Sequence, residues 1–162
     1  MSRPDETLAV AEGRLWCDAV VFEAALGAGR AREALELYRG DFLDGGLASE
    51  VSPDFELWAD QVRRRLRQRA ARGLWAIADQ EALAAHSVAA LDAARRARDL
   101  APDDEPGTRQ LVALLDRLGD RAGALRVYQE LVDRLAREFE AEPSAETRAL
   151  GDAIRGGVMA PA

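Results

Sequence analysis

The chain has 162 residues, of which 48% are hydrophobic and 31% charged, and its formal net charge is −7. This balance is typical of a globular domain with a sizeable core. All 22 basic residues are arginine, which excludes phosphate loops and covalent catalysis that need a lysine. The acidity argues against nucleic-acid binding by this chain alone, and the lone Cys17 excludes a disulfide scaffold.

Neither a membrane anchor nor an export signal is expected. No stretch approaches the roughly 20 apolar residues that span a bilayer. The first six residues are polar and lack the apolar region and cleavage site of a secretory signal. We therefore expect a cytoplasmic protein with no membrane partner.

In chain order, the first predicted element is short. Residues 7–10 and 14–16, with a glycine between them, resemble a β-hairpin. From Asp18, a plausible N-cap, the apolar spacing becomes helical. The sequence then predicts an all-α fold. Helices are expected over residues 18–26, 31–38, 53–79, 88–100, 108–118 and 122–138, and a last helix between a cap at Ser144 and a stop at Gly156.

An internal repeat predicts how these helices pack. Gly29, Ala34 and Tyr38 have the same spacing as Gly119, Ala124 and Tyr128, and a further Ala-Leu pair lies 34 residues before the second copy, which is the tetratricopeptide period. Glycine allows a tight turn, and alanine allows close helix contact. The pattern favours a superhelical stack of helical repeats. Because Ala85-His86 stands in place of Gly119-Asp120, we expect the first of the two tandem turns to be looser or longer.

Residues for catalysis are scarce. The only histidine, His86, lies in a predicted surface turn, and Cys17 has no cationic neighbour that would activate its thiol. The acidic runs lack the alternating ligands and glycine of a calcium loop. We expect no enzyme activity, no cofactor and no metal.

Six arginines occur within residues 63–72 of the long predicted helix. One interpretation is a solvated surface that pairs with carboxylates of neighbouring helices. The sharper one is a docking face for a carboxylate-rich or phosphate-bearing partner, with Arg63, Arg64, Arg67 and Arg69 as its candidates. Trp58 and Trp75, on the same helix, are expected in the core rather than on a stacking platform.

From about Asp18 to Ile154, the chain resembles the bacterial transcriptional activator domain. The resemblance is carried by residues 37–45 (Leu-Tyr-Arg-Gly-Asp-Phe-Leu-Asp-Gly), 55–58, 102–105, 119–128 and 142–150. The chain departs from the usual pattern at Ala101 and at residues 139–141. In that family the helical module follows a winged-helix DNA-binding domain, which this chain lacks, so we expect an excised fragment or a shortened regulator.

The resemblance implies a division into residues 1–17, a remnant of an upstream domain, 18–156, the helical module, and 157–162, a tail. It also implies a regulatory module for protein contacts or self-association, for example as a homodimer, with DNA read by a missing or separate domain. The alternative is a free-standing adaptor that binds a peptide or protein outside transcription. The residues expected at the structural contacts are Ala34, Tyr38, Phe42, Trp58, Ala124 and Tyr128.

Overall fold

The computed structural model describes residues 15–44 and 51–157, and in this part of the chain it contains seven α-helices and no strand. The all-α prediction is thus confirmed, whereas most of the expected β-hairpin falls on residues 7–14, outside the described ranges. The helices are α1 (Asp18–Gly27), α2 (Ala31–Leu37), α3 (Pro53–Leu83), α4 (Ser87–Leu100), α5 (Glu105–Arg117), α6 (Arg121–Phe139) and α7 (Ala145–Gly156).

Four helices are preceded by an N-cap residue whose side chain accepts a hydrogen bond from the backbone N–H three residues later. These N-caps satisfy donors that the first helical turn leaves free, and they are Ser52, Asp104, Asp120 and Ser144. The prediction for α1 was wrong by one residue. Cys17 occupies the cap without a side-chain hydrogen bond, and Asp18 is the first helical residue, where its charge favours the helix dipole.

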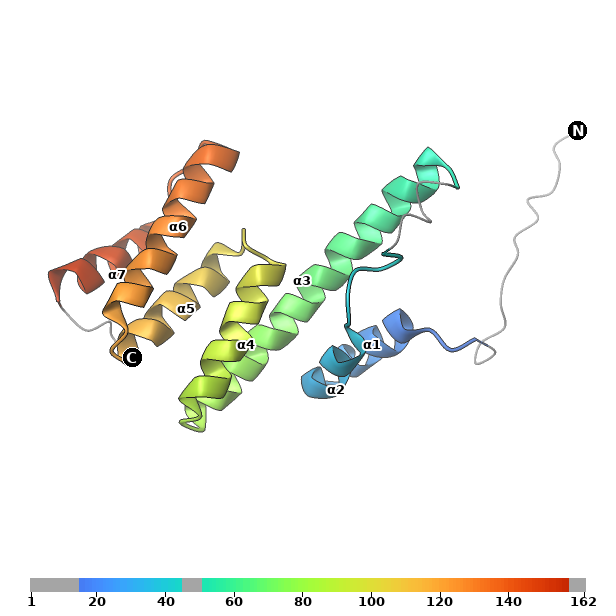
Figure 1. Cartoon of the computed structure of the whole chain (residues 1–162), viewed down its shortest axis with the longest axis horizontal. Coiled ribbons are helices and arrows are strands. Elements are labelled where there is room, and N and C mark those ends of the chain that lie inside the picture. The colour runs from blue at the N-terminus through green and yellow to red at the C-terminus, as the bar shows by residue number, and fades with distance from the viewer. Residues whose placement is uncertain (1–14, 45–50, 158–162) are drawn as a thin grey trace, which may run out of the picture.

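The helices form three antiparallel hairpins, α1–α2, α3–α4 and α5–α6, and α7 packs on the last of them (Figure 1). The longest helix, α3, extends past the end of α4 at its N-terminal side (Figure 1). It also continues to Leu83, four residues beyond the expected Asp79, and Ala82 in this last turn packs against the core. One helix therefore contacts both the first hairpin and its own partner, α4.

The three hairpins turn in the same way. Each turn has a residue with left-handed backbone, at Gly29 (φ 76°), Ala85 (φ 60°) and Gly119 (φ 84°). The next residue donates its amide to the carbonyl five positions earlier, at 2.8–2.9 Å, as in a Schellman cap. Contrary to the expectation of a looser or longer first tandem turn, the turn at Ala85 has the same length and hydrogen bonds as the one at Gly119.

Exchanging alanine and glycine at these turns tests the strain at Ala85. A left-handed backbone costs an L-residue roughly 1–2 kcal/mol, and part of this is offset because glycine has a more disordered unfolded state. We expect Ala85→Gly to raise the free energy of unfolding by about 0.5–1 kcal/mol in urea titrations. Gly119→Ala should lower the free energy of unfolding by a similar amount. A Cβ at position 119 meets nothing within 4 Å, so the cost comes from the left-handed backbone alone. Equal stability of both variants and the wild type would contradict this assignment.

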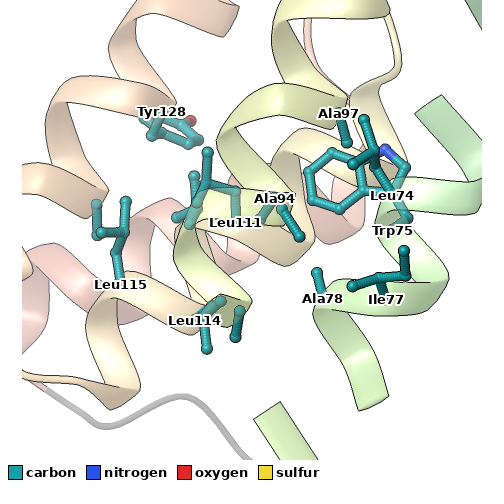
Figure 2. Close-up of a cluster of buried hydrophobic side chains, with 14 of the residues drawn as sticks. Leu74, Trp75, Ile77, Ala78, Ala94, Ala97, Leu111, Leu114, Leu115 and Tyr128 are labelled. Carbon is teal, nitrogen blue, oxygen red and sulfur yellow. The ribbon is translucent and has the colours of Figure 1, made fainter. Parts of the chain in front are cut away.

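The core consists of two clusters along α3. The first joins α1 and α2 to the middle of α3 through Phe22, Ala34 and Leu66. The second runs from the C-terminal half of α3 through α4, α5 and α6 to α7, and Figure 2 shows its leucine, alanine and aromatic side chains. Leu35 and Leu100 pack against both clusters, so that the three hairpins share one continuous apolar interior.

Candidate functional site

The arginine-rich part of α3 lies against the segment that joins α2 to α3. Arg63 donates from Nε to the carbonyl of Phe42 at 2.7 Å and from Nη2 to the carbonyl of Leu43 at 2.9 Å. Its third nitrogen, Nη1, pairs with Asp60 at 2.7 Å. Leu43 has a left-handed backbone with φ 52°. A single guanidinium therefore fixes a strained loop to the helix, which uses the planar fork that distinguishes arginine from lysine.

One turn further along α3, Arg67 forms a bidentate pair with Asp41 of the same loop. This hydrogen bonding lowers the pKa of Asp41 below its ordinary value. The hydroxyl of Tyr38 lies 3.4 Å from the same carboxylate, and burial raises the pKa of Tyr38. At neutral pH the cluster therefore holds a neutral phenol, a carboxylate and a guanidinium, a combination that stabilises the loop.

Arg69 and Arg65 contact α1 instead. Their guanidinium groups lie 3.0 Å and 3.3 Å from the carboxylate of Glu23, and Arg69 also donates to the Glu23 carbonyl at 3.3 Å. Arg64 is exposed and has no ion pair among residues 15–44 and 51–157. Of the four candidates for a docking face, the structure thus engages Arg63, Arg67 and Arg69 within the molecule and leaves Arg64 at the surface.

These contacts favour the interpretation of the arginine cluster as a surface that pairs with neighbouring carboxylates. A partner that bound Arg63 or Arg67 would have to displace contacts that hold the α2–α3 loop. The cluster therefore acts first as a scaffold for what the loop presents.

Phe42 of this loop forms an aromatic patch with Phe55 and Trp58 of α3. The Phe42 and Trp58 rings meet edge to face with centroids 5.6 Å apart, and the Phe55 and Trp58 centroids are 5.2 Å apart. Trp58 is 47% exposed, so the prediction that it is a core residue is corrected, while Trp75 is buried as expected. Trp58 lies outside the core because α4 does not extend along this half of α3 (Figure 1).

The other predicted contact residues lie at helix–helix packing positions. Ala34 and Ala124 are completely buried. Tyr38 is partly buried, with its ring centroid 5.6 Å from that of Phe22. Tyr128 is buried in the second cluster. The equivalent turns thus place equivalent alanines in the interior.

A pocket of about 470 Å³ lies between α1 and the α2–α3 loop, lined by Phe22, Tyr38, Asp41 and Phe42 among others. Its walls combine aromatic rings with three carboxylates, of which Asp41 is paired with Arg67 and the other two are Asp18 and Asp44. The pocket offers no nucleophile paired with a base, which a catalytic site of the acyl-transfer type needs.

The titratable residues considered for chemistry lie elsewhere. His86 caps α4 at the surface, and its Nδ1 is 2.7 Å from Glu81; hydrogen bonds from His86 and Arg32 lower the pKa of Glu81. Cys17 is half-buried. Within the described ranges, no group of three or more His, Cys, Asp or Glu side chains could hold a metal ion. No described helix is long and apolar enough to cross a membrane.

The fold and this site define a helical-repeat module without an evident catalytic constellation in the described residues. The family model of the bacterial transcriptional activator domain matches residues 9–155. The chain therefore belongs to this family, which is a regulatory helical domain. No similar curated protein and no similar solved structure was found.

Proposed function

We propose that this chain, whose family has a role related to transcriptional activation, acts as a protein-interaction module. It contacts a partner or a second copy while a separate domain reads the DNA. The observation that carries this proposal is the aromatic patch. Trp58 is half-exposed on the projecting end of α3, and Leu57, next to it in sequence, is 62% exposed.

The patch has the character of an interaction surface for two reasons. Tryptophan is enriched among residues that contribute most to binding, because it buries a large area at little entropic cost. The patch is also held rigidly, since Arg63 anchors the loop that carries Phe42. Little ordering is therefore needed on binding, which favours affinity.

A reporter assay tests the proposal. The chain is fused to a DNA-binding domain that does not activate transcription by itself. The DNA site of this domain lies upstream of a bacterial reporter gene. We expect the fusion to raise reporter transcription and Trp58→Ser with Leu57→Ser to remove most of the increase, because the apolar contact surface is lost. Leu83→Ser is the matched control, since Leu83 is 89% exposed at the opposite end of the same helix. Transcription equal to that of the DNA-binding domain alone would overturn the proposal.

A further inference from the structure

A groove lies between α2 and α4, where the first two hairpins meet. These two helices flank α3 (Figure 1). Its floor is apolar and includes Leu35, Leu74 and Leu100. Arg39 and Arg96 line its walls, and both are exposed. The groove is open to the surface and has a volume of about 310 Å³, whereas a closed cavity of about 150 Å³ already accepts a benzene ring. An aromatic side chain therefore fits.

The next groove in the row, between α4 and α6, is bridged by an ion pair. Arg98 on α4 lies 3.1 Å from the carboxylate of Glu130 on α6. Among the described residues no ion pair crosses from α2 to α4. Arg96 is 3.9 Å from Asp92 of its own helix, and Arg39 makes a long hydrogen bond of 3.5 Å to a backbone carbonyl of α2. The α2–α4 groove is open, and its guanidinium groups are weakly engaged.

The charge of this groove selects its occupant. Among the described residues that line the groove, the one carboxylate is Asp99, which is itself 3.8 Å from Arg98, and the Asp92 carboxylate 3.9 Å from Arg96 lies outside this lining. The groove is therefore locally positive, although the chain carries a net charge of −7. An apolar floor between two guanidinium groups fits an apolar anchor flanked by carboxylates, because guanidinium and carboxylate groups form paired hydrogen bonds.

The chain carries such an anchor where α6 ends. Phe139 is 53% exposed, although large apolar side chains are normally buried. Glu138, Glu140 and Glu142 flank it, and all three are exposed. Glu138 lies 3.9 Å from Arg134 and Glu142 3.1 Å from Arg148, so Glu140 is the one of the three without an ion pair in the described residues. Glu140 has a left-handed backbone with φ 50°, and the next amide donates to an α6 carbonyl at 3.1 Å. The turn therefore holds this acidic peg, residues 138–142, in a defined shape.

We propose that the acidic peg of one copy of the chain inserts into the α2–α4 groove of a second copy. In Figure 1 the C-terminal end of α6 lies far from α2, which forms one wall of the groove, so the contact joins two molecules. Two different surfaces meet in such an interface, which makes it heterologous and able to close into a ring or to extend. This inference rests on the proposed function and specifies the surfaces of self-association.

Sedimentation velocity over a range of concentrations tests this interface. The wild-type chain is compared with Phe139→Ser and with the double variant Arg39→Glu/Arg96→Glu. We expect wild type to associate as its concentration rises, and each variant to weaken association at least about tenfold, since central anchors dominate binding energy. Leu83→Ser and Arg72→Glu are matched controls, being an exposed leucine and an exposed arginine outside both surfaces, and should leave association unchanged. Thermal melts establish that every variant folds.

Mixing the two impaired variants gives a sharper test. Phe139→Ser keeps an intact groove, and Arg39→Glu/Arg96→Glu keeps an intact peg, so one functional contact can form between them. At a concentration where each variant alone stays monomeric, we expect the mixture to yield a dimer and no larger species. A mixture that stays monomeric, while wild type associates, overturns the peg-and-groove contact.

Two further results overturn the proposal. One is a wild-type chain that stays monomeric at every concentration. This result overturns the proposal even if a synthetic acidic peptide with a central phenylalanine binds the groove, because the natural occupant of the groove is then another protein. The other is association that the peg and groove variants affect no more than the controls do. Either result leaves the reporter assay on the aromatic patch unaffected, so failure of this inference is distinguishable from failure of the proposed function.

Discussion

Replacing Tyr128 with alanine is expected to lower the free energy of unfolding by about 3–5 kcal/mol, the range for removing a large buried aromatic side chain. Tyr128 is buried between α6 and α7, where the guanidinium carbon of Arg155 lies 4.9 Å from the ring centroid. The ring also lies directly over Gly151, so a Cβ at that glycine would lie 2.5 Å from two ring atoms. Urea unfolding followed by circular dichroism measures the change.

Gly151→Ala provides the matched test of this packing. In the wild-type background it should cost about 1–3 kcal/mol through overpacking. In the Tyr128→Ala background the added methyl group enters the space that the ring has left, so the cost should be much smaller. The difference is the coupling energy of the pair. Additive effects of the two substitutions would show that α7 does not pack on the ring as described. Tyr128→Phe, which keeps the ring, should have a much smaller effect.

Replacing Arg63 with alanine is expected to cost about 1–3 kcal/mol, because the partly buried carbonyls of Phe42 and Leu43 lose their donor. The loop carrying Phe42 should loosen as well. Faster amide hydrogen exchange at Asp44, whose N–H donates to the Asp41 carbonyl at 3.2 Å, would report this directly. Reporter transcription should fall too, since Phe42 supports Trp58.

Arg64→Ala is the control for Arg63→Ala, since its guanidinium is exposed one position along the same helix. It should leave both stability and hydrogen exchange near the wild-type values. The stability and the hydrogen exchange of Arg63→Lys should lie between those of Arg63→Ala and the wild type, because one ammonium group cannot reproduce the planar fork that reaches both carbonyls and Asp60. Equal behaviour of the Arg63 and Arg64 variants would contradict the loop-anchoring role.

The aromatic patch and the groove could not be predicted from the sequence. Phe42 and Trp58 are 16 positions apart, and nothing in the spacing says that a loop and a helix will bring their rings together. Arg39 and Arg96 are farther apart still. Arg39 has no arginine beside it in the sequence, and Arg96 stands among Arg95 and Arg98 with nothing in the spacing to show that it faces α2. The acidic residues at 138–142 read as a solvated loop, because the exposure of Phe139 depends on which helices cover the end of α6.

The all-α class, most of the helix bounds and the two glycine turns at Gly29 and Gly119 could be predicted from the sequence. Those features depend on apolar periodicity, caps and glycines within a few residues of one another, which the chain order displays directly. Three outcomes could not be read from the sequence: Trp58 is exposed, the turn at Ala85 matches the one at Gly119, and three arginines of α3 are engaged within the molecule, namely Arg63, Arg67 and Arg69. These outcomes depend on how far each helix extends beside its neighbours, and long-range packing can impose a backbone conformation that the local residue disfavours.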